Sequence, residues 1–330
     1  MPPADPPRPT SSAVVLACGL ATLDVVQTVD HVPAPDEKIV AADLMVAAGG
    51  PAANAAVTCA ALGVRARLLT RIGDGTLATA VHADLAAHGV EVLDVADAGA
   101  EPPVSTVLVT RASGERAVVS VNGTAGRGRP RPDVVVPGEL WNDVAVVLVD
   151  GHHLDLAVRC AREARRRGVV VLLDGGSWKP GLEELLGLVD VAVLSADFAV
   201  PEGGPDVLED VRRTGPAVVA QSRGAAPILV AAAGERSTVS VPAVDVVDTL
   251  GAGDVLHGAL AARIATRGIG PAPAGAWAHR REALPTTGVA GWVEALGWAA
   301  QVASRSCASH GPRGWTTDAA IVAWRRDLAD

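Results

Sequence analysis

Short apolar runs alternate with longer segments of mixed polarity along most of this chain. Runs such as 144–149, 169–173 and 191–194 are built almost entirely from Val, Leu and Ala, and a polar cluster follows each of them. Strands that are apolar throughout are typical of a parallel sheet covered by helices on both faces. The strands expected on this basis are 14–18, 64–69, 144–149, 169–173, 191–194, 217–220, 228–232 and 238–241. The pattern predicts an α/β fold with three layers, α/β/α, around a central, mainly parallel sheet.

Two regions do not follow that alternation. Residues 26–46 resemble strands interrupted by prolines and acidic residues, and the runs 104–110 and 116–121 flank a short turn that contains glycine. Strand-like runs joined by such a turn predict a hairpin. We assign both regions to one small β-sheet, formed by about 26–47 and 101–123, and expect it to cover a functional site as a lid.

The chain of 330 residues is long enough to bury a large core, either as one large α/β domain or as two smaller ones. Residues 1–12 are rich in proline and lack the apolar core of a signal peptide. We therefore expect a disordered tail over 1–12 and one domain over 13–330.

Charge and cysteine usage narrow the possible partners. The net charge is −9 and the one dense basic run, 162–167, falls on an expected helix, so a nucleic-acid or anionic-membrane surface is not expected. No apolar run is long enough to cross a bilayer. The four cysteines are far apart and lie among apolar residues, which is typical of buried, reduced side chains. A cytoplasmic location is predicted.

The most informative stretch is 246–256, Val-Val-Asp-Thr-Leu-Gly-Ala-Gly-Asp-Val-Leu. An expected strand at 241–247 leads into a turn of small residues, and the turn opens a helix over about 253–266. Gly251 and Gly253 would let successive backbone N–H groups approach one anion, and the positive end of the helix dipole would add to the attraction.

Asp254 follows in the first helical turn, as the one carboxylate near this anion pocket that could take a proton. An anion pocket beside a proton acceptor is what phosphoryl transfer to a hydroxyl group requires. The alternative is that Asp254 only stabilises the helix N-terminus, as acidic residues in a first turn do.

The string Asp-Thr-Leu-Gly-Ala-Gly-Asp at 248–254 resembles the C-terminal signature of the ribokinase-like (PfkB) carbohydrate kinases. No Gly-Lys-Ser/Thr follows it, so it is not a Walker A loop. The resemblance implies that Asp254 is the catalytic base and that Gly251, Ala252 and Gly253 form the anion hole. It also implies the family's fold, with a lid that closes over the sugar and excludes water, which would compete as phosphoryl acceptor.

A second stretch, Gly-Gly-Pro-Ala-Ala-Asn at 49–54, resembles the family's N-terminal signature, and its proline suits the first position of a helix. The resemblance implies that Gly49, Gly50 and Asn54 bind the sugar. It also implies that Asp24, expected at the carboxyl end of the first strand, holds sugar hydroxyls. The alternatives are a tightly packed helix start for Asn54 and a simple turn for Asp24.

The chain departs from the family pattern on the nucleotide side. Ser195 and Phe198 stand where the family often has Asn-x-x-Glu, which weakens any transfer of metal contacts to these positions and resembles the ketohexokinase branch. Of the family's Thr-x-Gly-x-x-Gly only Gly224 is kept, with Arg223 before it. Arg223 could reach a nucleotide phosphate, although an exposed loop arginine is the simpler interpretation.

The resemblance places ATP along the C-terminal half of the chain, beside an expected irregular loop at 268–285. The residues implied to bind ATP are Thr249, Arg223, Gly224, Ala303 and Cys307. Mg²⁺ is expected to bridge the phosphates, largely through water, and Asp248 is implied to hold a monovalent cation such as K⁺.

Three further polar residues, His152, Asp174 and Lys179, follow the ends of expected strands, and each fits either a site or a surface loop. The neighbouring histidines 152 and 153 have no third ligand at a matching spacing, so they do not indicate a metal site.

The sequence predicts an ATP-dependent sugar kinase that transfers the γ-phosphate to a hydroxyl group of a small carbohydrate. Its expected partners are the sugar and ATP, and a homodimer through the lid is a further expectation. A nucleoside kinase of the same superfamily is one alternative, which the absence of Tyr and the single Phe disfavour. A catalytically silent sugar-binding protein is the other. The sequence does not name the sugar.

Overall fold

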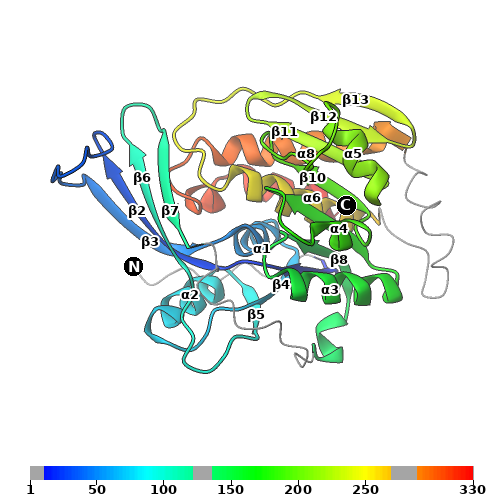
Figure 1. Cartoon of the computed structure of the whole chain (residues 1–330), viewed down its shortest axis with the longest axis horizontal. Coiled ribbons are helices and arrows are strands. Elements are labelled where there is room, and N and C mark those ends of the chain that lie inside the picture. Colours follow the sequence, from blue (N-terminus) through cyan, green and yellow to red (C-terminus); the bar gives the residue numbers. More distant parts are fainter. Residues whose placement is uncertain (1–10, 122–135, 269–287, 330) are drawn as a thin grey trace.

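The computed structural model describes residues 11–121, 136–268 and 288–329. Its main sheet has nine strands, which are β1 (Val14–Cys18), β4 (Arg65–Thr70), β5 (Val90–Asp94), β8 (Val144–Val149), β9 (Val170–Gly175), β10 (Val191–Leu194), β11 (Val218–Arg223), β12 (Ala226–Ala232) and β13 (Glu235–Val239). They lie in the order β13-β12-β11-β10-β9-β8-β1-β4-β5 (Figure 1). All neighbours from β11 to β5 are parallel, and only β12 and β13 run antiparallel to their neighbours. The predicted α/β fold with a mainly parallel central sheet is confirmed.

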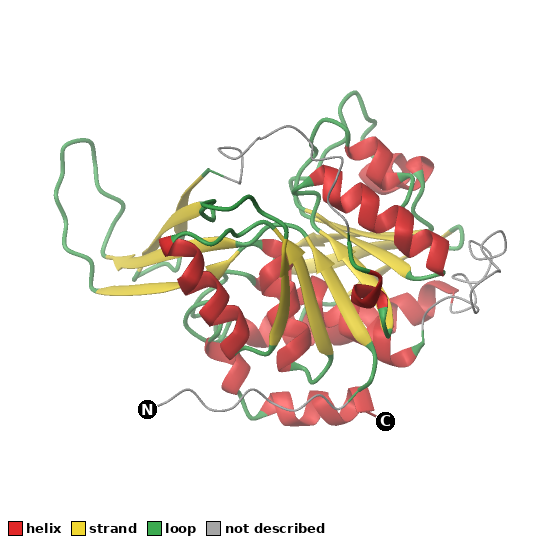
Figure 2. Cartoon of the chain, turned by 90° about the horizontal axis from the view of Figure 1, so that it is seen from below, coloured by secondary structure: helices red, strands yellow, loops and turns green. Residues whose placement is uncertain are grey.

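Helices cover both faces of this sheet (Figure 2). One face packs against α1 (Pro51–Ala61), α2 (Thr76–Ala87), α6 (Ala252–Arg267), α8 (Gly288–Ser306) and α9 (Ala320–Ala329), and the other against α3 (Leu154–Arg167), α4 (Leu182–Leu186) and α5 (Val207–Thr214). Strand β1 explains the unbroken apolar runs. Val15 and Ala17 enter one core, whereas Val14, Leu16 and Cys18 enter the other. A strand with two buried faces has no position for a polar side chain.

A second sheet of four strands extends from one end of the main sheet (Figure 1). Its strands, in spatial order, are β3 (Asp43–Gly49), β2 (Thr22–Val29), β6 (Val104–Thr110) and β7 (Arg116–Ser120). Strand β2 begins at Thr22, so Asp24 is its third residue. The expectation that Asp24 ends the first strand of the main sheet is therefore wrong. Residues 19–21 alone carry the chain from one sheet into the other.

The strand expected at 241–247 is also wrong. Strand β13 ends at Val239, and the described residues 240–250 contain no strand. Pro242 has no N–H to give to a sheet ladder. The N–H groups of Val247 and Asp248 instead donate to the carbonyl oxygen of Cys307, at 2.8 and 3.1 Å. An apolar run is consistent with a strand, but here the end of α8 supplies the hydrogen-bond partner.

Two segments for which the sequence makes a prediction are largely absent from the described residues. The expected tail at 1–12 and the expected loop at 268–285 lie almost wholly outside the described residues. No helix in the described ranges is both long and apolar enough to cross a membrane.

Candidate active site

Two helices bring the two sequence motifs together. Asn54 lies at the start of α1 and Asp254 at the start of α6, and these helices pack against each other. The Asn54 Nδ2 donates a hydrogen bond to the Asp254 Oδ2 at 2.6 Å, although the two residues are 200 positions apart. Gly258 permits this close packing, because a Cβ there would lie 2.6 Å from the Ala55 carbonyl oxygen.

The turn before α6 presents backbone donors beside this pair. Gly251 has a φ of +78°, in the left-handed region that favours glycine, and its Cβ position is 3.8 Å from Asp254 Oδ2. No described side chain caps the helix. The N–H groups of Gly253 and Asp254 belong to the first turn, where an α-helix has no internal acceptor for them. Together with the helix dipole, these groups can hold an anion.

The half-buried carboxyl group of Asp254 has surroundings that raise its pKa from 3.8 to about 7. Burial is the largest cause, and the charge of Asp174 adds to it. The hydrogen bond from Asn54 and the charge of His257 act in the opposite direction. A base with a pKa near neutral pH is well suited to take a proton from a hydroxyl group.

Asp24, which the sequence predicts to bind the sugar, lies against the paired glycines. Its carboxylate accepts a hydrogen bond from Thr22 Oγ1 at 2.6 Å, and the residue is only 8% exposed. Burial raises the pKa of Asp24, and the hydrogen bond from Thr22 opposes the shift. A Cβ at Gly49 would overlap this carboxylate, whereas Gly50 has a φ of +94° and a Cβ there would overlap the Leu20 carbonyl group. Gly49 is therefore required by the close approach of Asp24, and Gly50 by its positive φ and the close approach of Leu20.

Arg313 belongs to this site and was not predicted. Its Nη1 donates to the Asn54 Oδ1 at 2.7 Å, and its side chain is 12% exposed. Arg313 lies in the loop after α8, far from both motifs in the sequence. Nothing in the local pattern there distinguishes it from a surface arginine.

His257 was also missed, although it lies one helical turn after Asp254. The residue is buried, with its Nδ1 2.6 Å from the Gly253 carbonyl oxygen and 3.3 Å from Asp174 Oδ2. Its Nε2 lies 3.0 Å from the Val193 carbonyl oxygen. Both ring nitrogens thus face acceptor oxygens of neighbouring elements. Burial raises the pKa of Asp174, and the charge of His257 opposes that shift.

Asp150 holds the backbone of the site together. Its Oδ2 accepts hydrogen bonds from the N–H groups of Leu20 at 2.8 Å and Ala52 at 3.1 Å, and its Oδ1 from that of His152 at 2.8 Å. The carboxylate thereby joins the end of β8 to the starts of β2 and α1. Lys179 is half-buried nearby, where burial lowers its pKa and the charge of Asp150 raises it.

Two of the residues expected to bind ATP, Ala303 and Cys307, lie beside Asp248, the residue expected to hold a monovalent cation. Both oxygens of Asp248 accept backbone hydrogen bonds, from Leu250 at 2.8 Å and from Gly311 at 2.9 Å. Cys307 holds the same segment through its carbonyl oxygen, and its Sγ contacts the Ala303 carbonyl oxygen at 3.4 Å. These contacts give Asp248 a structural role, and a K⁺ ion there stays an expectation of the resemblance alone.

Two other expected contacts come from separate places. The exposed Thr249 accepts a hydrogen bond from Arg116 of the second sheet at 3.2 Å. Arg223 and Gly224 lie at the turn between β11 and β12, where the exposed Arg223 donates to the Pro227 carbonyl oxygen at 2.8 and 3.1 Å. The recorded contacts of Arg223 therefore stay within its own hairpin.

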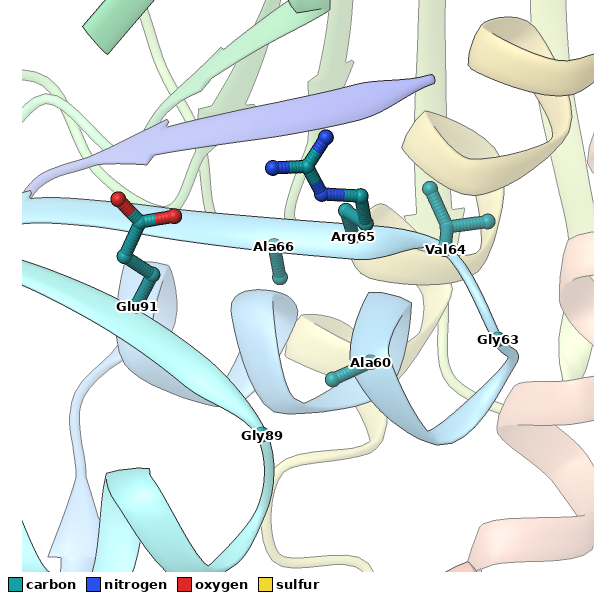
Figure 3. Close-up of a pocket in the computed structure, with 7 residues that line it drawn as sticks. All are labelled: Ala60, Gly63, Val64, Arg65, Ala66, Gly89 and Glu91. Atoms are coloured by element: carbon teal, nitrogen blue, oxygen red, sulfur yellow. The ribbon is translucent and has the colours of Figure 1, made fainter. Parts of the chain in front are cut away.

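The described residues contain no group of three or more His, Cys, Asp or Glu side chains arranged to hold a metal ion. A small cavity, of about 130 Å³, lies at the amino ends of β4 and β5, opposite the site (Figure 3). Its lining residues are Ala60, Gly63, Val64, Arg65, Ala66, Gly89 and Glu91. Pockets for small ligands usually enclose about 300–1,000 Å³, so this cavity is too small for a sugar with a nucleotide.

An anion-binding turn beside a proton acceptor, at the carboxyl ends of parallel strands, is the arrangement expected of a phosphotransferase that acts on an alcohol group. Comparison with known families is more specific. The model of the pfkB family carbohydrate kinases matches residues 13–316, so the chain belongs to the PfkB family of carbohydrate kinases. It is an ATP-dependent kinase that phosphorylates a hydroxyl group of a carbohydrate.

Individual relatives agree with this assignment. The ribokinase of Arabidopsis thaliana is 26% identical over 263 residues, which cover 75% of this chain and 69% of that protein. An ATP-dependent ribose-1-phosphate kinase of Halopiger xanaduensis is 30% identical over 167 residues, or 49% of this chain and 54% of that one. A crystal structure of an Agrobacterium tumefaciens protein, provisionally assigned as a ribokinase, superposes with a TM-score of 0.76 at 23% identity, covering 96% and 98% of the two chains. The closer resemblance to ketohexokinases stays a prediction.

Proposed function

We propose that this kinase transfers the γ-phosphate of ATP to a hydroxyl group of a small sugar, with Asp254 as the base. The backbone amides of Gly251 to Gly253 would surround the transferred phosphate. The observation that supports this most strongly is the 2.6 Å hydrogen bond between Asn54 and Asp254. It joins the sugar-side motif to the phosphate-side motif at one point, and the reaction needs its two substrates in contact.

Each group has a distinct task in this mechanism. Asp24 accepts hydrogen bonds from sugar hydroxyls, and Asn54 helps to orient the sugar. Asp254 takes the proton of the attacking hydroxyl group of the sugar. The oxygen of that hydroxyl group bonds to the γ-phosphorus as the bond between this phosphorus and the leaving ADP oxygen breaks. General-base assistance of this kind is worth about 10²–10⁴ in rate, and positioning and charge stabilisation supply the remainder.

Magnesium bound with ATP would supply positive charge that neutralises the phosphates. Mg²⁺ in kinases keeps several waters and binds mainly to phosphate oxygens and one or two carboxylates. Asp174 is the carboxylate nearest to that description, since it is buried at the carboxyl end of β9 beside Asp254.

The test is a magnesium–ATP assay of the full chain with a panel of acceptors. The panel includes ribose, ribose 1-phosphate, ketoses, other aldoses, sugar acids and nucleosides, since the relatives named above act on ribose or its phosphate. ADP formation that depends on one sugar, with the phosphate recovered on that sugar, would support the proposal. Tight sugar binding without turnover would instead favour a silent sugar-binding protein, and turnover of nucleosides alone would favour a nucleoside kinase.

We also propose that two copies of the chain associate through the second sheet. Register places Val46 of β3 in one row with Val119 of β7, and Leu44 lies on the same face. These side chains are 52%, 75% and 60% exposed. A row of exposed apolar side chains on a four-stranded sheet is typical of an interaction surface, and a second copy offers the same surface by two-fold symmetry.

A further inference from the structure

The Arg313 side chain contacts three separate elements around the site. Besides its bond to Asn54 of α1, its Nη2 donates to the Ala48 carbonyl oxygen of β3 at 2.9 Å. The same nitrogen lies 3.8 Å from Asp84 Oδ2 of α2, and that oxygen accepts a hydrogen bond from the Ala48 N–H at 3.2 Å. The guanidinium group therefore holds the end of β3, where the Gly49–Gly50 turn begins, against both helices.

The chemistry of arginine decides how the Asn54 amide is oriented. A guanidinium group carries donors only, so the amide atom that faces Arg313 must be the oxygen. The NH₂ group of Asn54 then faces Asp254, to which it donates. If the amide turned over, its oxygen would face the Asp254 carboxylate, acceptor against acceptor. That arrangement would favour Asp254 in its protonated form, which cannot act as a base.

We infer that Arg313 is a positioning residue, which acts through Asn54 to keep Asp254 ready to accept a proton. The inference rests on the proposed function, because it takes Asp254 as the base. Neither sequence motif includes Arg313. Its hydrogen bonds go to Asn54 and to the Ala48 carbonyl oxygen, and through Asn54 it acts on Asp254.

The charges around the pair explain why a cation is useful here. The groups that face Asp254 or Arg313 are Asp24 of β2, Asp84 of α2, Asp150 after β8, Asp174 of β9 and His257 of α6. Of these, Asp174 and Asp150 disfavour a negative charge on Asp254. The positive charge of Arg313 opposes that effect, as it does for Asp24, whose pKa it acts to lower.

The test compares two substitutions at position 313 with a matched control. Arg313→Met keeps the length of the side chain but removes its charge and donors, and Arg313→Lys keeps the charge without the planar fork. The control is Arg67→Met. Arg67 is 7% exposed and donates to the Leu140 and Asn142 carbonyl oxygens at 2.7 and 2.8 Å, close to the amino end of the sheet. The Arg67→Met variant therefore loses a comparable set of contacts, but far from the site.

For each variant, kcat/KM is measured with the best acceptor from pH 5 to 9, and folding is checked by thermal unfolding. Arg313→Met should lower kcat/KM about 10- to 100-fold and move the acidic limb of its pH profile upward by about 0.5–1 unit. In Arg313→Lys, the acidic limb of the pH profile should lie closer to that of the wild type, and kcat/KM should be only partly restored. Arg67→Met should lower the unfolding temperature and leave the pH profile unchanged.

A double-mutant cycle tests the route through Asn54. Asn54→Ser removes the amide, and in that background Arg313→Met should change kcat/KM by no more than about threefold. Additive losses would overturn the inference, and so would an unmoved acidic limb in a folded Arg313→Met. If the wild-type chain phosphorylates no acceptor, or if Asp254→Asn keeps full activity, the proposed function itself fails. The two failures are therefore distinguishable.

Discussion

At the scale of single residues, the site depends on a balance of charges around one carboxyl group. Burial and the charge of Asp174 favour the protonated form of Asp254, whereas Asn54 and His257 favour the ionised form. The resulting pKa of about 7 leaves the group sensitive to small changes in its surroundings. The raised pKa affects both the pH dependence of catalysis and the stability of an Asp254→Asn variant.

The first concerns the pH dependence of catalysis. Asp254 accepts a proton only when ionised, and its pKa is raised to about 7, so kcat/KM should fall as the pH drops below neutral. Initial rates at subsaturating sugar, with ATP and magnesium in excess, give the profile. An acidic limb near pH 4, the ordinary range of an aspartate, would contradict the raised pKa.

The second concerns Asp254→Asn. It should lower kcat by about 10²-fold or more, since the proposed general base is lost. A group whose pKa is raised on folding stabilises the native state at low pH, and that contribution is lost as the pH rises from 3.8 to about 7. Asparagine does not ionise, so the variant is not destabilised in this way. At pH 8 it should be at least as stable as the wild type in thermal unfolding. Near-normal turnover would remove Asp254 from the base role.

At the scale of elements, the contact between α1 and α6 decides whether the two motifs meet. Gly258 lies where the helices are closest, and the Cys59 Sγ also donates to its carbonyl oxygen at 3.2 Å. A side chain at this position would have to push against the backbone of α1. The separation of Asn54 and Asp254 would then increase.

Gly258→Ala should therefore be harmful in spite of the better helix propensity of alanine. Its Cβ would lie 2.6 Å from the Ala55 carbonyl oxygen, and we expect a loss of about 1–3 kcal/mol in the free energy of unfolding, with a lower kcat/KM. Gly297→Ala in α8 is the control, because its Cβ would meet its nearest neighbour at an ordinary 3.7 Å. That variant should gain up to about 1 kcal/mol. Equal effects in urea unfolding would refute the close-packing argument.

At the scale of the whole molecule, the second sheet has two different faces. One carries Asp24 and Ser105, which face the site, and the other carries the exposed row of Val46 and Val119. The hairpin between β6 and β7 also reaches the turn before α6, through Arg116 and Thr249. Under the proposed function, the first face would cover the sugar and the second would meet a second copy of the chain.

Val46→Asp should disrupt that association. A charge in the middle of an apolar interface costs several kcal/mol unless it is paired, so the variant should be monomeric where the wild type is dimeric. Light scattering after size-exclusion chromatography measures the mass. Val322→Asp on α9 is the control, since Val322 is 51% exposed compared with 52% for Val46. A monomeric wild type at micromolar concentration would refute the dimer.

Local patterns in the sequence were sufficient for the architecture and for two of the motifs. Apolar strands followed by polar clusters predicted a parallel sheet with both faces buried, because burial on two faces constrains every residue of a strand. The glycine-rich turn that opens a helix before Asp254 could also be predicted from local sequence, since Gly251 has a φ of +78°, which favours glycine. The glycines at 49 and 50 carry a similar constraint, although the reason lies in the approach of Asp24 and Leu20.

The tertiary structure alone decided which distant residues meet. The contact of Asn54 with Asp254, the position of Arg313 and the burial of His257 between Gly253 and Val193 depend on how α1, α6 and the loop after α8 pack. The mistaken strand at 241–247 has the same origin, because its hydrogen-bond partner is the carbonyl group of Cys307. Local patterns record what one segment buries, but a hydrogen bond between segments depends on the packing of the entire chain.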